Sequence, residues 1–307
     1  MTDKTIYIAG QEGMVGRQIY KLFKSKGLNV IDCKRKDLNL TSQLDVNNWF
    51  KKFKPNVVIN AAGKVGGILD NSLNKKDYIY VNTMIGFNLL NASLAYNIKK
   101  FINIASACIY PKKTKQPISE QSLLSSKLEE TNEAYAISKI SVLKFCEYIK
   151  VELKKDFITL QPTNLYGEGD NFNLKSSHVI PALIRKFHEA KSNNKTSVEV
   201  WGSGRPQREF MHTSDLADAV YFCLNNKIIE NFINVSSGDY LSIKKLANLI
   251  KNITGFKGKI HFNNKYPDGV MKRKLDNNRL KKLGWKSKVR LKDGLKIYYN
   301  YFKTLTL

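Results

Sequence analysis

A glycine-rich loop between a short apolar run and an amphipathic segment constrains the fold of this chain more than any other feature. Residues 5–9 read Thr-Ile-Tyr-Ile-Ala, which favours a buried strand, and glycines follow at positions 10, 13 and 16. Residues 17–26 then have helical spacing, and a second apolar run covers 28–33. Glycines allow a tight turn and a close approach of the backbone, and a helix N-terminus offers N–H donors. This order of segments therefore predicts a dinucleotide-binding unit whose loop holds a pyrophosphate.

The alternation of strand and helix patterns continues along the chain. Apolar runs at 57–60, 101–105 and 157–162 read as buried strands. Residues 82–96, between the first two of these runs, have a helical pattern. Such alternation implies an α/β fold with a doubly wound parallel sheet of the Rossmann type, with ligands at the carboxyl ends of its strands. We place the dinucleotide-binding domain at 1–163. A smaller C-terminal α/β lobe is expected at 164–307, with some of its segments returning to the first domain.

Tyr135 and Lys139 lie four residues apart in a segment of helix formers, so they share one face of the predicted helix. An ammonium beside a phenol favours the phenolate and is expected to lower the pKa of Tyr135 toward neutrality, which suits proton transfer at a carbonyl oxygen. The same spacing occurs on many helices whose tyrosine is simply half-exposed. However, Ser106, Cys108 and Asn164 follow predicted strands and fall at the edge of the sheet where ligands bind, which favours the catalytic interpretation.

The composition argues against several other classes of protein. The formal net charge is +25, from 51 Lys and Arg against 26 Asp and Glu, but the lysines are spread along the chain without a basic tail. We therefore expect a solvated basic surface that attracts anionic ligands, and no nucleic-acid partner. No apolar run is long enough to span a bilayer, so no membrane partner is expected. The four cysteines are widely spaced, which argues against a metal site or disulfides and favours a cytoplasmic location.

The residues after the second apolar run bear on the choice of cofactor. Asp32 stands near the position where an acid accepts a hydrogen bond from the ribose 2′-hydroxyl of NAD. Residues 34–36 (Lys-Arg-Lys) follow at once, and a basic cluster there suits the 2′-phosphate of NADP. NADP(H) is therefore favoured over NAD(H), with Arg35 as a cofactor contact. The alternative for the cluster is a solvated run of charges.

Longer motifs connect the chain to one family. They span nearly the whole sequence in that family's order, at 62–68 (AGKVGGI), 106–111 (SACIYP), 131–139 (TNEAYAISK), 162–167 (PTNLYG), 177–190, 200–210 and 267–269 (PDG). Together with the glycine loop, they make the chain resemble an extended short-chain dehydrogenase/reductase and, within that superfamily, a GDP-L-fucose synthase. The resemblance implies an enzyme that epimerises a GDP-4-keto-6-deoxy-sugar at C3 and C5 and then reduces it at C4.

The resemblance also implies a role for each reacting group. Cys108 would be the base and His178 the acid of the epimerisation, and a thiol and an imidazole both titrate near neutrality, as such partners require. Ser106 and Tyr135 would hold the carbonyl oxygen of the sugar, and Tyr135 would protonate the alkoxide formed when NADPH delivers hydride to C4. Lys139 would bind the nicotinamide ribose. Taken alone, Cys108 could instead be a small buried thiol and His178 an ordinary hydrogen-bonded histidine.

Ligand contacts follow from the same resemblance. The cofactor contacts are Gly10, Gly13, Met14, Val15, Gly16, Arg35, Ala61, Ala62, Ile104, Ala105, Lys139, Pro162, Asn164, Leu165 and His178. The contacts with the GDP-linked 4-keto sugar are Lys186, Trp201, Arg208 and Asp268. Core packing is the alternative for Trp201. Members of the family are often dimers through two helices of the cofactor domain, so a homodimer is expected.

This sequence departs from the family pattern at stretches that contact ligands. Gln11 and Glu12 stand where His-Arg is common, Lys186 where an arginine is frequent, and residues 270–273 read VMKR where TPRK is usual. These departures keep a second enzyme open, namely a C4-reductase of a related GDP-4-keto sugar such as a GDP-heptose. Such a reductase would work with a separate epimerase in the biosynthesis of surface-polysaccharide sugars. A basic nucleic-acid-binding protein on the same fold is the least favoured alternative.

Overall fold

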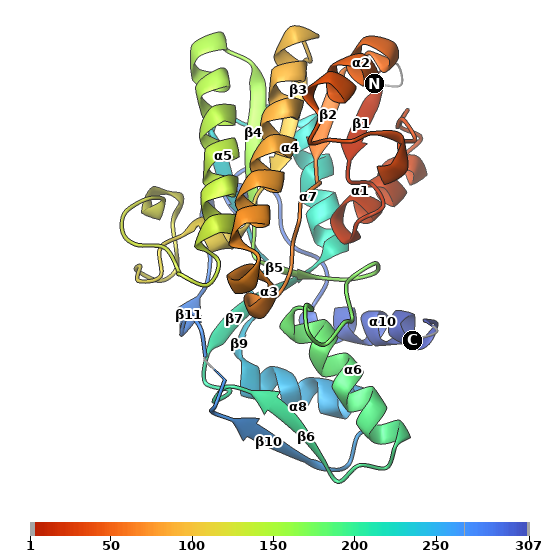
Figure 1. Cartoon of the computed structure of the whole chain (residues 1–307), viewed down its shortest axis with the longest axis vertical. Coiled ribbons are helices and arrows are strands. Elements are labelled where there is room, and N and C mark those ends of the chain that lie inside the picture. The colour runs from red at the N-terminus through yellow and green to blue at the C-terminus, as the bar shows by residue number, and fades with distance from the viewer. Residues whose placement is uncertain (1–3, 267, 306–307) are drawn as a thin grey trace.

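The computed structural model of the protein describes residues 4–266 and 268–305, so Pro267 of the 267–269 motif lies outside the described residues. Its main feature is a five-stranded sheet in the order β1-β2-β3-β4-β8 (Figure 1). The strands are β1 (Ile6–Ala9), β2 (Val57–Asn60), β3 (Lys100–Ile104), β4 (Asp156–Pro162) and β8 (Phe232–Val235). All neighbouring strands of this sheet pair in parallel. The predicted parallel α/β sheet is thus confirmed.

Helices cover both faces of this sheet, because successive residues of a strand point to opposite sides. Ile6 and Ile8 of β1 belong to a core shared with α1 and α7, whereas Tyr7 and Ala9 belong to a core shared with α2, α4 and α5. The bounds of these helices are α1 Met14–Ser25, α2 Gln43–Phe53, α4 Lys75–Ala95, α5 Glu133–Leu153 and α7 Thr213–Asn225. This double winding aligns the carboxyl ends of β1, β2 and β3 at one edge of the sheet.

The apolar run at 28–33 does not form the strand that its composition predicts. It makes a single bridge between Val30 and Ile6, with hydrogen bonds from Ile6 N to Asn29 O and from Ile31 N to Ile6 O, both at 2.9 Å. The segment has a strand neighbour on one side only and then enters the 3₁₀ turn η1 (Arg35–Asp37), so the pairing ends after these two bonds. Helix α4 also begins seven residues before the predicted start at 82, at Lys75.

The second lobe lies below the main sheet in Figure 1 and has a core of its own. Its strands form a sheet in the order β11-β7-β5, with β9 antiparallel to β7, and a two-stranded β10-β6 sheet. The strands are β5 (Asn164–Tyr166), β6 (Ser197–Trp201), β7 (Gln207–His212), β9 (Tyr240–Ser242), β10 (Lys259–Asn263) and β11 (Lys272–Arg273). The helices are α6 (Val179–Ser192), α8 (Ile243–Thr254) and α10 (Leu291–Lys303). Because α7 and β8 follow β7 in the chain but pack in the first lobe, the chain passes between the lobes more than once.

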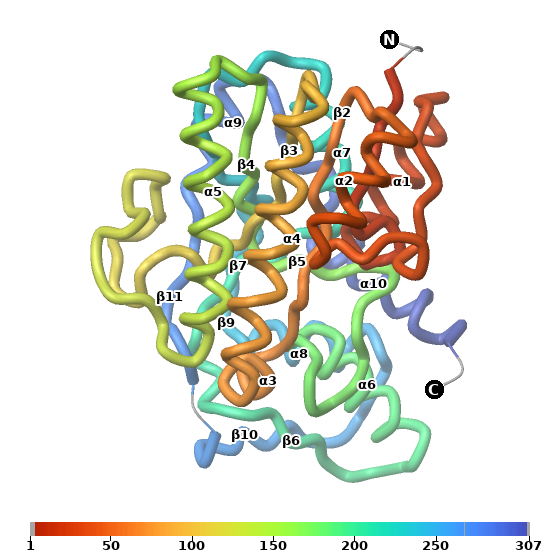
Figure 2. The backbone as a smooth tube through the Cα atoms, turned by 45° about the horizontal axis from the view of Figure 1, so that its top comes forward, coloured from red at the N-terminus to blue at the C-terminus, as the bar shows by residue number. Residues whose placement is uncertain are grey.

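Several short elements connect these layers. They are α3 (Ile68–Leu73), the 3₁₀ turns η2 (Ala107–Ile109) and η3 (Glu120–Ser122), and α9 (Asn278–Lys282). The segment between η2 and α5, yellow in Figure 2, lies beside α5 and β11, where Ile118 N donates to Lys274 O at 2.7 Å. Among the described residues, no helix combines the length and the apolar character needed to cross a membrane.

Candidate active site

The glycine loop lies at the carboxyl end of β1, and its shape requires two of its glycines. A Cβ atom on Gly16 would lie 2.1 Å from Gly10 O, and a Cβ atom on Gly10, whose φ is +79°, would lie 2.8 Å from Ala62 Cα. Gly13 N donates to Gly10 O at 3.0 Å and closes the turn. Helix α1 then begins at Met14 without a capping side chain, so the N–H groups of its first turn can bind an anion. This arrangement fits the pyrophosphate of a dinucleotide.

Lys139 is buried between the carboxyl ends of β2 and β3. Its Nζ donates to Ile104 O at 3.3 Å, and a Cβ atom on Gly63 would lie 3.3 Å from the same Nζ. The Nζ lies 5.8 Å from the centre of the Tyr135 ring. The other predicted cofactor contacts at these strand ends are Ala61, Ala62 and Ala105. Burial lowers the pKa of Lys139 to about 8, so the ammonium is still the main form at neutral pH.

Ser106, Cys108 and Tyr135 converge, although Tyr135 comes from α5 and the other two from the end of β3. The Ser106 Oγ accepts a hydrogen bond from Cys108 N at 3.3 Å, which shapes the turn η2. Burial raises the pKa of Tyr135 strongly, and negative charge on Cys108 would raise it further, whereas a hydrogen bond with Ser106 lowers it. The phenol therefore lies near both the Ser106 hydroxyl and the Cys108 thiol. These are the three groups that the proton chemistry requires.

The predicted effect of Lys139 on Tyr135 is wrong. The pKa of Tyr135 is raised rather than lowered, because burial disfavours the phenolate more than the hydrogen bond with Ser106 stabilises it. Tyr135 is therefore a neutral phenol at physiological pH. A neutral phenol can donate a proton to a carbonyl oxygen that becomes an alkoxide, which is the direction that a reduction needs.

His178 precedes α6 as its N-cap residue and is exposed as a whole, yet burial around its ring lowers its pKa. Its loop is held against the loop after β2 by the hydrogen bond from Gly67 N to Ser176 O at 2.8 Å. The loop after β2 also contacts Tyr78, whose ring packs edge-on against Tyr135 with centroids 6.1 Å apart. Among the described contacts, none joins His178 directly to the three converging groups, so its role as the acid stays a prediction.

Arg208 connects these groups to the second lobe. Burial and, to a smaller extent, the charge of Arg273 lower the pKa of its guanidinium to about 10, although negative charge on Cys108, Tyr240 or Asp268 acts in the opposite direction. Arg208 therefore lies within electrostatic reach of both Cys108 in the first lobe and Asp268 in the second. A guanidinium at this position can bind a diphosphate that links a sugar near Cys108 to a base near Asp268.

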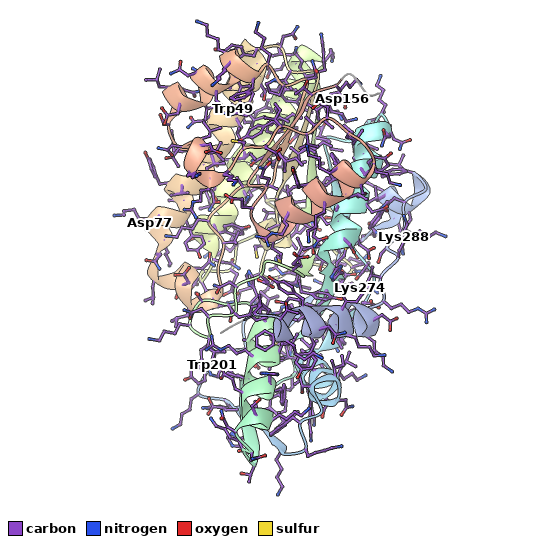
Figure 3. All side chains as sticks on the ribbon, turned by 90° about the vertical axis from the view of Figure 1, so that its right-hand side faces the viewer. Trp49, Asp77, Asp156, Trp201, Lys274 and Lys288 are labelled. Atoms are coloured by element: carbon purple, nitrogen blue, oxygen red, sulfur yellow. The ribbon has the colours of Figure 1, made fainter. Side chains whose placement is uncertain are left out.

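Of the predicted nucleotide contacts, Asp268 lines a pocket of the second lobe, and Trp201 stacks on Tyr266, which lines the same pocket. The pocket has a volume of about 320 Å³ and is lined by Ser203, Arg205, Asn264, Tyr266 and Asp268. Trp201 lies in the lower lobe (Figure 3) and is 41 % exposed, so core packing is excluded as its role. Its ring stacks on Tyr266 with centroids 4.3 Å apart, and the Lys186 Nζ lies 4.9 Å from its centre. Asp268 accepts hydrogen bonds from Ser203 N and Ser203 Oγ, both at 2.7 Å.

The remaining predicted cofactor contacts lie on two segments. Pro162 ends β4, and Asn164 and Leu165 belong to β5. The Asn164 Nδ2 donates a hydrogen bond to Glu209 O at 2.9 Å. Arg35 is exposed at the start of η1. Asp32, the acid considered for NAD, instead accepts a hydrogen bond from Tyr20 Oη at 2.5 Å.

Two residues near the site were missed from the sequence. The buried Arg273 donates hydrogen bonds to Ala107 O and to Tyr110 O, and it lies opposite Arg208 in the β11-β7 pairing. It therefore positions the turn that carries Cys108. Tyr266, which stacks on Trp201, could have been found as an aromatic residue two positions before Asp268. No short-range pattern identifies Arg273, because its partners lie far away in the sequence.

Comparison with known proteins agrees with this geometry. The model of the NAD dependent epimerase/dehydratase family matches residues 6–236. The chain therefore belongs to this family. Within it, the predicted kinship with the GDP-L-fucose synthases is confirmed. The chain is 45 % identical to a putative GDP-L-fucose synthase 2 of Arabidopsis thaliana, over 97 % of this chain and 91 % of the relative. It is 40 % identical to the GDP-L-fucose synthase of Escherichia coli, over 98 % and 97 %.

Solved structures of similar proteins include reductases of heptose nucleotides. A GDP-6-OMe-4-keto-L-xylo-heptose reductase from C. jejuni matches with a TM-score of 0.92 and 34 % identity, over 99 % of both chains. MlghC, a GDP-mannoheptose C4 reductase from Campylobacter jejuni with NADP bound, matches with a TM-score of 0.91 and 36 % identity, also over 99 % of both chains.

Proposed function

We propose that this protein is an NADP(H)-dependent epimerase/reductase that acts on a GDP-4-keto-6-deoxy-sugar, inverting C3 and C5 and then reducing C4. The observation that carries this proposal is the convergence of Ser106, Cys108 and Tyr135 beside the buried Lys139. Relatives named GDP-L-fucose synthase, at 40 % and 45 % identity over nearly the whole chain, support the same activity.

The residues of the chain account for the reduction. The glycine loop fits the pyrophosphate of NADP(H), and Lys139 is placed to bind the nicotinamide ribose. Bound NADPH would supply the hydride that reaches C4 of the sugar. Ser106 and Tyr135 would hold the C4 oxygen by hydrogen bonds, and the neutral Tyr135 would give it a proton as the charge develops. The ammonium of Lys139 would stabilise the phenolate that remains.

The epimerisation uses the same oxygen-binding groups. The protons at C3 and C5 are acidic because both carbons neighbour the C4 carbonyl, and the hydrogen bonds from Ser106 and Tyr135 would stabilise the enolate. Cys108 would remove each proton from one face, and His178 would return a proton to the other. Arg208 and Asp268 would bind the diphosphate and the nucleotide, respectively, with Lys186 and Trp201 beside them.

A C4-reductase of a GDP-heptose is the second candidate. The two structural matches that are named as heptose reductases favour it, since they cover 99 % of this chain at TM-scores of 0.92 and 0.91. Such an enzyme would use Ser106, Tyr135 and Lys139 as described and would receive a sugar that a separate epimerase has already processed. Both candidates fit the biosynthesis of surface-polysaccharide sugars.

One experiment separates the two candidates. The protein is incubated with NADPH and GDP-4-keto-6-deoxy-mannose in heavy water, and the product is analysed by NMR. Deuterium at C3 and C5 of a product reduced at C4 supports the epimerase/reductase. Reduction without deuterium at these carbons favours the reductase. Tyr135→Phe should abolish NADPH oxidation in either case. Cys108→Ser should suppress the deuterium exchange while sparing hydride transfer to a ketone that is already epimerised. A Cys108→Ser variant that exchanges normally would show that another group is the base.

We further propose that the protein forms a homodimer through α4 and α5 and acts in the cytoplasm. On the outer side of these helices, Phe87, Ser141, Phe145 and Tyr148 are among the residues that line a shallow, largely apolar pocket, and Tyr148 is 54 % exposed. A second copy would cover this apolar surface. Light scattering should give the mass of a dimer for the native protein and of a monomer for Tyr148→Arg.

All four cysteines are unpaired, which supports the proposed location in the cytoplasm, a reducing compartment.

A further inference from the structure

The site for the cofactor's adenosine ribose contains carboxylates as well as the predicted cations. Glu12 Oε2 accepts a hydrogen bond from Arg35 N at 2.7 Å, and Asp37 Oδ2 accepts one from Lys34 N at 2.8 Å. Glu12 belongs to the glycine loop and Arg35 to the turn after the first bridge, so this bond joins the two segments that flank the ribose in a dinucleotide-binding unit. Glu12, Lys34 and Arg35 are all exposed, which leaves their charged groups accessible to a ligand.

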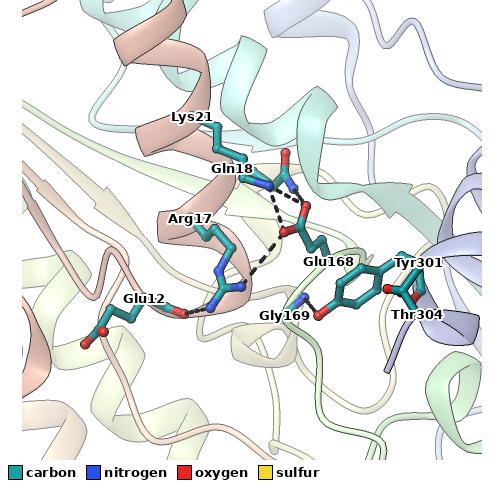
Figure 4. Close-up of polar contacts among 8 residues, drawn as sticks. All are labelled: Glu12, Arg17, Gln18, Lys21, Glu168, Gly169, Tyr301 and Thr304. Carbon is teal, nitrogen blue, oxygen red and sulfur yellow. Dashed lines mark hydrogen bonds and ion pairs between the residues drawn. The ribbon is translucent and has the colours of Figure 1, made fainter. Parts of the chain in front are cut away.

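The carboxylate of Glu12 is directed toward this turn and not toward its basic neighbour in α1. Arg17 Nη2 donates to the backbone carbonyl of Glu12 at 3.1 Å, and Arg17 Nη1 lies 3.9 Å from Glu168 Oε1. Figure 4 shows the Glu12 side chain extending away from the Arg17 guanidinium. Burial raises the pKa of Cys33, beside the turn, and the charges of Asp37 and Glu12 raise it further. The carboxylates of Glu12 and Asp37 therefore both lie near the turn η1.

Asp32, which is the usual acid for the ribose hydroxyls, is engaged elsewhere. Its Oδ1 accepts the hydrogen bond from Tyr20 Oη at 2.5 Å, and its Oδ2 lies 4.0 Å from Lys24 Nζ. Tyr20 and Lys24 lie on the second half of α1, away from the glycine loop. Glu12 is thus the carboxylate that the loop itself presents at the ribose.

We propose that Glu12 accepts a hydrogen bond from the ribose 2′-hydroxyl of NADH, so that the enzyme uses NADH as well as NADPH. The proposal rests on the proposed function for the class of cofactor and adds a second member of that class. A carboxylate binds a 2′-hydroxyl and repels a 2′-phosphate, whereas Lys34 and Arg35 attract the phosphate. With both kinds of group present, neither cofactor is rejected.

The test measures the affinity for NADPH and NADH separately from turnover. Quenching of tryptophan fluorescence gives both dissociation constants without any sugar, and kcat/KM for both cofactors is measured where a sugar is turned over. The native protein should bind the two cofactors with dissociation constants that differ by less than about tenfold, since the preference of Glu12 for the 2′-hydroxyl and the attraction of Lys34 and Arg35 for the 2′-phosphate are of similar size and oppose each other. Loss of turnover with intact binding would refute the proposed reaction and leave this proposal standing.

Two variants test whether Glu12 is responsible. Glu12→Gln keeps the length of the side chain and an acceptor for Arg35 N but removes the charge, and it should weaken NADH binding by about tenfold and strengthen NADPH binding. Glu12→Arg should enlarge both changes. Arg35→Ala is the matched control for the phosphate and should weaken only NADPH binding. A native protein that rejects NADH by several hundredfold, or a Glu12→Gln variant with an unchanged ratio of the two affinities, would overturn the proposal.

Discussion

Lys139→Met is predicted to make the folded protein more stable while abolishing its activity. Lys139 is 6 % exposed, its Nζ donates one hydrogen bond to Ile104 O, and burial lowers its pKa from 10.5 to about 8. A methionine has a similar length and no charge to desolvate, so it can occupy the same space at lower cost. Activity should be lost because no ammonium remains beside Tyr135 and at the proposed position of the nicotinamide ribose.

The size of the gain follows from the pKa. A lowering of about 2.5 corresponds to a destabilisation of about 3 kcal/mol at pH 7, where the lysine is charged in both the folded and the unfolded chain. Between about pH 8 and 10.5 the unfolded chain binds more protons than the folded chain, so the stability of the native protein rises with pH. The gain of the variant falls accordingly to about 1 kcal/mol at pH 9.5. Loss of the hydrogen bond to Ile104 O subtracts about 1 kcal/mol at both pH values.

Urea unfolding without cofactor tests this reasoning at the two pH values. Lys139→Met should raise the free energy of unfolding by about 2 kcal/mol at pH 7 and by almost nothing at pH 9.5. Lys144→Met is the matched control on the same helix. Its half-buried Nζ pairs with Glu147 at 2.8 Å, so its removal should change stability by less than about 1 kcal/mol at both pH values. A Lys139→Met variant that is less stable than the native protein at pH 7, or equally stabilised at both pH values, would refute the argument.

Three further substitutions have defined outcomes. Gly16→Ala would place a Cβ atom 2.1 Å from a backbone carbonyl of the glycine loop, and calorimetric titration should show the loss of cofactor binding. Gly86→Ala would place a Cβ atom 2.2 Å from Val142 Cγ2, which should lower the free energy of unfolding by about 1–3 kcal/mol. Adding Val142→Ala to this variant should recover part of the lost stability. Arg273→Met removes the hydrogen bond to Ala107 O, so kcat should fall at unchanged cofactor affinity. An equal loss of both would indicate general unfolding instead.

Short-range patterns made much of the fold and part of the site predictable. The glycine loop is marked by three glycines within seven residues, and Tyr135 and Lys139 share a helix face through their spacing alone. The pKa of Tyr135 was not predictable in this way, because it depends on how much of the phenol the fold buries. The contact from Arg273 to Ala107 joins residues 166 positions apart, beyond the reach of any local pattern. The run at 28–33 has a strand's composition, but only its place at the edge of the sheet decides how far it pairs.

Helix α10 completes the core of the second lobe, where Leu295, Tyr298 and Phe302 are buried together with residues of α6 and α8. On the ribosome, α6 and α8 emerge well before α10 is synthesised, so their apolar faces have to wait in an unfinished lobe. Nascent chains stalled before Leu291 should accordingly be cleaved rapidly by protease in this lobe. Release of α10 should protect it, which would make the completion of one late helix the step that commits the second lobe to its native state.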